Sequence, residues 1–424
     1  MTARALRELL DDEDRAPIEG AAPIVSVADD DDPAWLAALT EHGRAVFELE
    51  RRGHWHGRWV ELDDELDPRA RLPRPSVRRR RFVEGRPLVL RGAVAPALPQ
   101  WRNELFAAER ARERIADAAG FEAWLRTRLG RAGRASLTSV ESGGADAERD
   151  LSTARFRANG DAPAAWAKVG RLSTHPEDTS LRLRFGFGVE PDDDASADPR
   201  GHRAALSAAR ALLPEFAALE QDTALFATID EASPTEDALG PACPIAYWNR
   251  PGGGALMHHD AFAAVEDDAR QFGVLFVQLA GATAWLALST AQLAKRVQQF
   301  AALLDEGALP WVVEELGPTG ALEALDELAG DPFALADELG RPGQGRLGPL
   351  VNRGPEFTAL LADLGHAAVL RAGDAILLPN NGWRSTALHS VFCASDGANY
   401  ALSIGLRART QVGARRGSRR PRGR

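Results

Sequence analysis

The sequence predicts an α+β fold in which a barrel or sandwich of short β-strands follows a helical N-terminal part and is interrupted by a helical insertion. From Pro244 onward, short apolar segments such as IAYWN, FGVLFVQL and ATAWLAL are separated by glycines and prolines, which is typical of strands in a barrel or sandwich. Between about residues 290 and 365, apolar residues instead recur every three or four positions, as in an amphipathic helix.

Periodicity predicts the remaining elements in order. The expected helices lie around Ala5–Leu10, Asn103–Ala119, Phe121–Leu129 and Arg203–Leu219. Strands are expected near Ala45–Leu49 and Arg58–Leu62, in GRPLVLRGAV from Gly85, and after the insertion in HAAVLRAGDAILLP, STALHSVFC and NYALSIGLRAR. Proline and arginine dominate Leu72–Arg81, which indicates a linker.

Length, composition and charge exclude several classes of protein. With 424 residues, of which 45% are hydrophobic, the chain can bury a sizeable core. No run approaches the ~18 apolar residues of a membrane span, and the first residues lack the apolar stretch of a secretion signal, so we expect no membrane partner. Cys243 and Cys393 are far apart without metal-ligand spacing, which excludes a disulfide scaffold and favours a cytoplasmic location.

Charge is unevenly spread along the chain. The formal net charge is −10, yet the tail ends in RRGSRRPRGR, from Arg415 to Arg424. We interpret residues 410–424 as a disordered, solubilising tail. Contact of this tail with RNA or a ribosome is the alternative.

The strongest chemical signal is PGGGALMHHDAF, from Pro251 to Phe262. His258 and Asp260 are two positions apart, so on an extended strand both side chains leave the same face and can bind one ion. His389, in the strand after PNNGW, is the natural third ligand. Two histidines and a carboxylate leave coordination positions open, as in non-haem Fe(II) oxygenases, so we predict an Fe(II) site, although Mn, Ni or Zn accept the same ligand types.

Each part of this pattern has an alternative interpretation. His-x-Asp occurs by chance in many proteins, and His389 alone is compatible with a buried core histidine. If His259 were the ligand, Ala261 would leave a site without a carboxylate, which some halogenating enzymes use for chloride. His54 and His56 repeat the two-residue spacing without an evident partner ligand.

Three motifs follow one another along the chain. The first is PGGG followed by H-x-D, at Pro251–Gly254, His258 and Asp260. The second is Q-x-x-G followed by Trp, at Gln278, Gly281 and Trp285. The third is G-D, an apolar run, Pro, a loop, His and a final strand, at Gly373, Asp374, Pro379, His389, Asn399, Tyr400, Gly405, Arg407 and Ala408. In order and spacing, the motifs resemble the JmjC/cupin-fold 2-oxoglutarate oxygenases, most closely their ribosomal-oxygenase branch.

The resemblance covers about residues 85–409 without the insertion. It implies a double-stranded β-helix (cupin or jelly-roll) core, an Fe(II) cofactor and 2-oxoglutarate as co-substrate. With the composition, it implies three parts: a mixed N-terminal segment over residues 1–80, a catalytic domain over 81–409 with the helical insertion at about 290–365, and the Arg-rich tail over 410–424.

The chain departs from this family at the co-substrate site. Relatives place Arg or Lys just after the glycine of Q-x-x-G to bind the distal carboxylate of 2-oxoglutarate, whereas this chain reads Ala-Thr-Ala from Ala282. Arg407 follows His389 by 18 positions, a separation at which other oxygenase branches place such an arginine, and Ser403 shares its strand face. We therefore expect Arg407 and Ser403 to bind the co-substrate. The alternative is that Arg407 is only structural.

Three functions remain open on the sequence. The leading hypothesis is an Fe(II)- and 2-oxoglutarate-dependent hydroxylase of a protein side chain or small molecule. The second is a metal-binding cupin-like protein that does not use 2-oxoglutarate, which the missing cation after Gly281 favours. The third is an interaction protein whose tail binds RNA. The insertion is expected to supply a homodimer contact or a substrate lid.

Overall fold

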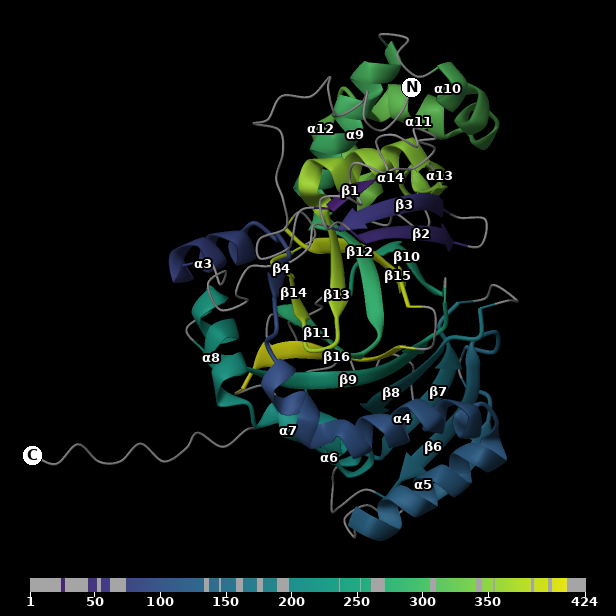
Figure 1. The fold of residues 1–424 in the computed structure, drawn as a ribbon, viewed down its shortest axis with the longest axis vertical. Helices are drawn as coiled ribbons and strands as arrows, with labels where there is room; N and C mark the ends of the chain where they lie inside the picture. Colours follow the sequence, from purple (N-terminus) through teal and green to yellow (C-terminus); the bar gives the residue numbers. More distant parts are fainter. Residues whose placement is uncertain are drawn as a thin grey trace, which may run out of the picture.

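The computed structural model describes residues 24–26, 45–51, 55–61, 74–132, 137–144, 146–157, 163–173, 178–188, 198–235, 237–251, 253–260, 271–305, 310–340, 345–353, 355–382, 385–395 and 399–409 (Figure 1). The helix expected around Ala5–Leu10 and the tail over residues 410–424 lie outside these ranges. The division of the chain into three parts stays a prediction.

A large antiparallel sheet forms the base of the molecule. Its nine strands lie in the order β4-β14-β11-β16-β9-β8-β7-β6-β5, with neighbours hydrogen-bonded throughout. In that order their bounds are Leu88–Leu90, Ala375–Pro379, Gly273–Ala280, Asn399–Ala408, Leu239–Asn249, Leu181–Phe187, Ala165–Arg171, Asp150–Phe156 and Leu137–Ser142.

A second, four-stranded antiparallel sheet lies over one end of the first. Its order is β10-β15-β12-β13, with bounds Gly254–His258, Ala387–Cys393, Ala282–Ser289 and Ala367–Arg371. Side chains from both sheets share one buried apolar cluster, which includes Val274, Phe276, Ile376, Trp285 and Val391. The two sheets therefore pack face to face around a common interior.

A small sheet completes the β-structure. Strands β1 (Ile24–Ser26), β3 (Trp55–Glu61) and β2 (Ala45–Arg51) pair in that order beside the helices of the insertion (Figure 1). Together with the helices below, the three antiparallel sheets confirm the predicted mixed α+β class.

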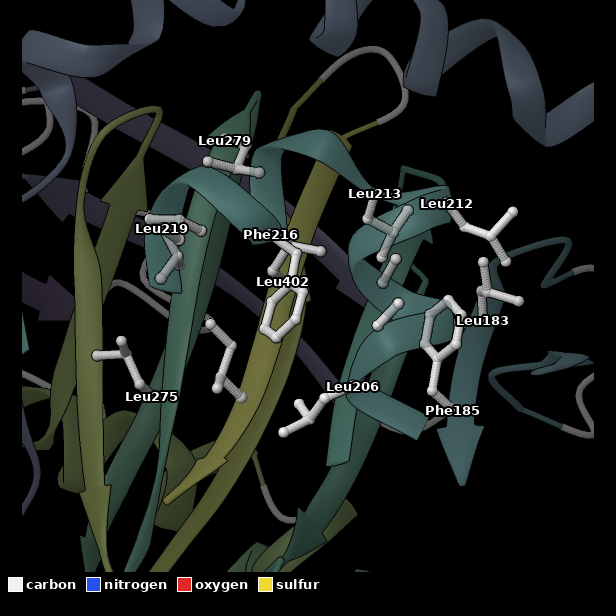
Figure 2. Packing of buried hydrophobic residues seen from close by; sticks show 14 of the residues in the cluster. Leu183, Phe185, Leu206, Leu212, Leu213, Phe216, Leu219, Leu275, Leu279 and Leu402 are labelled. Atoms are coloured by element: carbon white, nitrogen blue, oxygen red, sulfur yellow. The ribbon is translucent and has the colours of Figure 1, made fainter. Parts of the chain in front are cut away.

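Helices cover the outer face of the large sheet (Figure 1). They are α4 (Arg102–Ile115), α5 (Ala118–Ala132), α6 (Pro199–Leu212), α7 (Pro214–Glu220) and α8 (Thr223–Ala232), with η3 (Ala95–Trp101) leading into α4. Figure 2 shows the resulting core, in which Leu206 and Phe216 of the helices lie over Phe185 and Leu402 of the strands. Each strand of this layer buries one face against these helices.

Two predicted elements differ from the structure. The single helix predicted over Arg203–Leu219 is wrong, because Pro214 has no N–H with which to continue α6 and instead occupies the first turn of α7. Similarly, the segment predicted as a linker over Leu72–Arg81 overlaps α3 (Pro75–Val83), which also begins at a proline.

Between β12 and β13, the described residues form a series of helices. They are α9 (Thr290–Asp305), α10 (Pro310–Leu316), η6 (Gly317–Thr319), α11 (Ala321–Leu328), α12 (Pro332–Leu339), α13 (Gly348–Arg353), α14 (Pro355–Leu361) and η7 (Ala362–His366). Their apolar faces form one cluster with the outer side of the four-stranded sheet. Within the described residues, no helix is both long and apolar enough to span a membrane.

The insertion is anchored to β10 by a buried side chain. Asn352 of α13 accepts a hydrogen bond through its Oδ1 from the backbone N–H of Met257, at 2.8 Å. Met257 is fully buried, so this N–H has no access to water as a substitute partner. The inserted helices therefore hold the strand that ends at His258.

We predict that Asn352→Ala lowers the free energy of unfolding by about 1–3 kcal/mol, because it leaves the buried N–H of Met257 unsatisfied. Urea denaturation followed by circular dichroism measures the change. Thr127→Ala removes an exposed hydrogen bond within α5 and serves as control, with an expected change below about 0.5 kcal/mol. Equal values for both variants would contradict the anchoring role.

Candidate metal centre

The pairing of β10 with β15 brings two histidines together. His258 and His389 are direct cross-strand partners, and their ring centroids lie 4.3 Å apart. A close approach of the two strands at Gly254 makes this pairing feasible, since a Cβ there would lie 2.0 Å from the carbonyl oxygen of Val391. Strand packing thus explains why the last residue of the PGGG motif, Gly254, is a glycine.

Asp260 completes a group that can hold a metal ion. His258 Nε2 lies 3.6 Å from Asp260 Oδ1, and His389 Nε2 lies 3.6 Å from Asp260 Oδ2. One ligand atom from each residue lies within 4.8 Å of the other two. An ion with bonds of about 2.1 Å needs ligand atoms roughly 3–4 Å apart, so the donor set fits a metal after small side-chain adjustments.

The protonation of this group suits metal binding. Burial, and after it the charge of the neighbouring His258, lower the pKa of His389 to about 3 against the opposing effect of Asp260. Burial also raises the pKa of Asp260, but the side chains of His258 and His389 outweigh that effect and hold it below its ordinary value. At neutral pH the centre therefore presents a neutral imidazole and a carboxylate, the forms that bind metals.

The tautomer of His258 is set by the backbone. Its Nδ1 lies 2.6 Å from the carbonyl oxygen of Leu256, which only accepts hydrogen bonds, so Nδ1 carries the proton. The lone pair is then on Nε2, the atom that faces Asp260. Such an outer hydrogen bond orients a ligand imidazole before the metal arrives.

A glutamine positions the backbone of Asp260. Gln271 donates from Nε2 to the backbone carbonyl oxygen of Asp260 at 3.0 Å, and the backbone carbonyl oxygen of Gln271 accepts from Asn380 Nδ2 at 2.9 Å. The amide of Gln271 fits only because residue 405 is glycine, since a Cβ there would lie 2.6 Å from Gln271 Oε1. This explains the glycine of the final-strand motif.

The alternative ligands behave differently. His259 Nε2 lies 3.0 Å from the carbonyl oxygen of Gly340 at the end of α12, so this side chain faces the insertion. The residues that converge are therefore His258, Asp260 and His389, which is the set that includes a carboxylate. His54 lies outside the described residues, which leaves the spacing of His54 and His56 without a test.

The residue next to the position of the missing cation has a structural role. Thr283 is fully buried and donates from Oγ1 to Gln278 Oε1 at 2.8 Å, while accepting from Trp285 Nε1 at 2.8 Å. The Q-x-x-G and Trp motif residues thus form one hydrogen-bonded network within the sheet. The Trp285 ring in turn packs against the His389 ring, with centroids 5.5 Å apart.

The two predicted co-substrate residues lie on β16 but have different surroundings. The Ser403 side chain hydrogen-bonds to Tyr247 of β9, and the phenol of Tyr247 is close enough to Asp260 for that charge to act on it. Arg407 is fully buried, with Nη1 2.8 Å from Nε2 of His202 on α6. Contact of either residue with a co-substrate stays a prediction.

The sequence analysis did not identify Tyr247, which adjoins the centre. Burial raises the pKa of its phenol and the charge of Asp260 raises it further, whereas Arg182 and Arg184 of β8 oppose the rise. The tyrosine therefore lies between the candidate ligand Asp260 and two guanidinium groups. The two arginines belong to β8, whose sequence LRLRFGF alternates apolar and charged residues. This alternation predicts a strand and could have identified β8 from the sequence.

Comparison with known proteins adds little to this site. No protein-family model matches the chain, and no curated protein matches its sequence. Among solved structures, the chain is similar to YcfD, a ribosomal oxygenase from Escherichia coli, with 14% sequence identity and a TM-score of 0.20. The match covers 62% of this chain and 41% of that one. At this TM-score the likeness carries no functional argument.

We predict that Gly405→Ala weakens metal binding about 10- to 100-fold, the range found when outer hydrogen bonds of a metal site are lost. The new methyl group would displace the Gln271 amide and so release the backbone of Asp260. Binding of Co(II) or Fe(II) alone, measured by competition with a chelator, tests this. Gly317→Ala is the control, because a Cβ there meets nothing within 4 Å. Unchanged affinity in Gly405→Ala would contradict the role of Gln271.

Proposed function

We propose that this protein is an Fe(II)- and 2-oxoglutarate-dependent oxygenase that hydroxylates a protein side chain or a small molecule. One observation carries the proposal, namely that His258 at the end of β10, Asp260 two residues beyond it and His389 of β15 converge, although β10 and β15 are far apart in the sequence. Two imidazoles and one carboxylate on one side of an ion leave coordination positions for a co-substrate and oxygen.

The order of the strands supports a double-stranded β-helix core for this proposal. From β9 to β16, the chain alternates between the large sheet and the four-stranded sheet: β9, β11, β14 and β16 belong to the large sheet, and β10, β12, β13 and β15 belong to the four-stranded sheet. Such alternation winds the chain around a shared interior. Both histidine ligands come from the four-stranded sheet and face that interior beside Trp285.

When bound, Fe(II) would supply the redox chemistry, and the chain's residues would position the reactants. His258 and His389 would hold the ion as neutral imidazoles, with Asp260 as the anionic ligand. The buried walls formed by Trp285 and Phe276 would exclude water from the reacting groups. Ser403 and Tyr247, beside Asp260, would donate hydrogen bonds to a carboxylate of the co-substrate.

A metal-binding protein that does not use 2-oxoglutarate is the second candidate. It is favoured by one observation: Thr283, near the position where relatives carry a cation, belongs to a closed hydrogen-bond network. The contact of Arg407 with His202 also agrees with a structural role for that arginine. Under this candidate the same three residues bind a metal for a different reaction or for binding alone.

We predict that His258→Ala and Asp260→Ala each abolish iron-dependent formation of succinate from 2-oxoglutarate, since each removes one of three ligands. Succinate is measured with and without added Fe(II) at millimolar 2-oxoglutarate. His259→Ala is the matched control and should retain activity within a few-fold. Wild-type rates in both ligand variants would reject the assignment.

Anaerobic titration distinguishes the two candidates. We predict that 2-oxoglutarate added to the Fe(II) protein produces a weak visible charge-transfer band. Arg407→Gln should raise the half-saturating concentration about 10- to 100-fold if this guanidinium binds the distal carboxylate. Arg409→Gln, which changes an exposed arginine directly after the end of β16, should leave it unchanged. Absence of the band at millimolar co-substrate would favour the second candidate.

A further inference from the structure

The loop between β14 and β15 leads directly to the candidate ligand His389. It follows Pro379 with the asparagines of the PNNGW sequence and ends at Thr386, three positions before the histidine. Asn380 and Thr386 form an antiparallel bridge across the loop. The carbonyl oxygen of Thr386 also accepts a hydrogen bond from the backbone N–H of Thr290, at 3.1 Å. The backbone that enters β15 is therefore held on two sides.

The side chain of Asn380 connects this loop to the segment before β11. Its Nδ2 donates a hydrogen bond to the backbone carbonyl oxygen of Gln271 at 2.9 Å, and both residues are buried. Gln271 in turn donates from Nε2 to the backbone carbonyl oxygen of Asp260 at 3.0 Å. These two hydrogen bonds form a continuous connection from the loop that precedes His389 to the carboxylate ligand.

The amide of Asn380 continues the strand pairing beyond the point where the ladder stops. The ladder between β11 and β14 ends with the pair Gly273 and Pro379. The backbone N–H of Asn380 still donates to the carbonyl oxygen of Phe272 at 2.8 Å. Gln271 lies one residue further, and its carbonyl oxygen is reached by the asparagine side chain. The side-chain amide thus acts here as a main-chain N–H does within a sheet.

Other hydrogen bonds fix the shape of the loop itself. The backbone N–H of Asn381 donates to the carbonyl oxygen of Ser385 at 3.1 Å, and the N–H of Ser385 donates to that of Gly382 at 3.0 Å. Asn380 Oδ1 accepts a long hydrogen bond, of 3.4 Å, from the N–H of Gly382. The hydrogen bond of Asn380 Nδ2 is the one that leaves the loop, so its loss acts on the segment before β11.

The neighbouring asparagine has a different role. Asn381 donates from Nδ2 to the backbone carbonyl oxygen of Phe82 in α3, a helix that contributes no candidate ligand. The sequence PNNGW does not distinguish the two asparagines, whereas the structure directs one to the metal centre and the other to α3.

We propose that Asn380 is a positioning residue of the metal centre, which acts through Gln271 to hold Asp260 at the separation from His389 that one ion requires. Asp260 follows the end of β10, so the ladder with β15 does not fix its backbone. Its position then depends on outer hydrogen bonds, as that of many metal ligands does. The inference rests on the proposed function, of which the metal centre is part, but it requires neither 2-oxoglutarate nor a substrate.

The test is a double-mutant cycle on the affinity of the full chain for Co(II), measured by competition with a chelator. Asn380→Ala should weaken binding about tenfold and shift the visible absorption bands of bound Co(II), because an outer hydrogen bond is lost. In the Gln271→Ala background, the same substitution should weaken binding less than about twofold, since the connection to Asp260 is already broken.

Thermal unfolding without metal separates this role from a merely structural one. The backbone carbonyl of residue 271 remains in Gln271→Ala, so Asn380→Ala should lower the unfolding midpoint in both backgrounds. Asn381→Ala is the matched control, because it removes a hydrogen bond of the same kind from the same loop. It should lower the midpoint but leave the Co(II) affinity within about twofold of the wild type.

Three outcomes would overturn the proposal: unchanged Co(II) affinity in Asn380→Ala, equal losses of affinity in both backgrounds, or an equal loss in Asn381→Ala. Asn380→Leu, which keeps the side-chain volume without the donor, takes the place of Asn380→Ala if that variant does not fold. Absence of Co(II) binding by the wild type would reject the metal centre together with this role. Coupling without succinate formation would retain the role of Asn380 and reject only the oxygenase.

Discussion

The close pairing of β10 with β15 is the constraint on which the candidate metal centre depends. It makes His258 and His389 cross-strand neighbours, although they are 131 positions apart in the sequence. The pairing tolerates no side chain at residue 254, where a Cβ would meet the backbone of the partner strand. Without this approach the two imidazoles could not share an ion, and Asp260 alone would have no metal to bind.

Supporting contacts then restrain the third ligand and the strand itself. Gln271 fixes the backbone of Asp260 from one side, in a space that Gly405 leaves open. Asn352 fixes the backbone of Met257 from the insertion. The inserted helices thus contribute directly to the geometry of the centre, as outer hydrogen bonds do at metal sites generally. A role of the insertion as a lid or homodimer contact remains a prediction, as does the cytoplasmic location.

The two faces of the large sheet have different surroundings. Its outer face packs against helices and supplies the main apolar core, as Figure 2 illustrates around Phe216. Its inner face continues beyond β9 as a polar surface, where Arg182 and Lys168 follow Tyr247 away from the metal centre. The alternation of side chains along a strand is what allows one sheet to carry an apolar face and a polar face.

The sequence by itself determined the α+β class and the identity of the three candidate ligands, because the period of apolar residues and the His-x-Asp spacing are local properties. It did not identify β5–β8, Tyr247 or Gln271, although the alternation of LRLRFGF was present. Only the tertiary structure decided that His258, Asp260 and His389 converge and that His259 faces the insertion. The reason is physical, since cross-strand register and close backbone approach depend on residues distant in the chain.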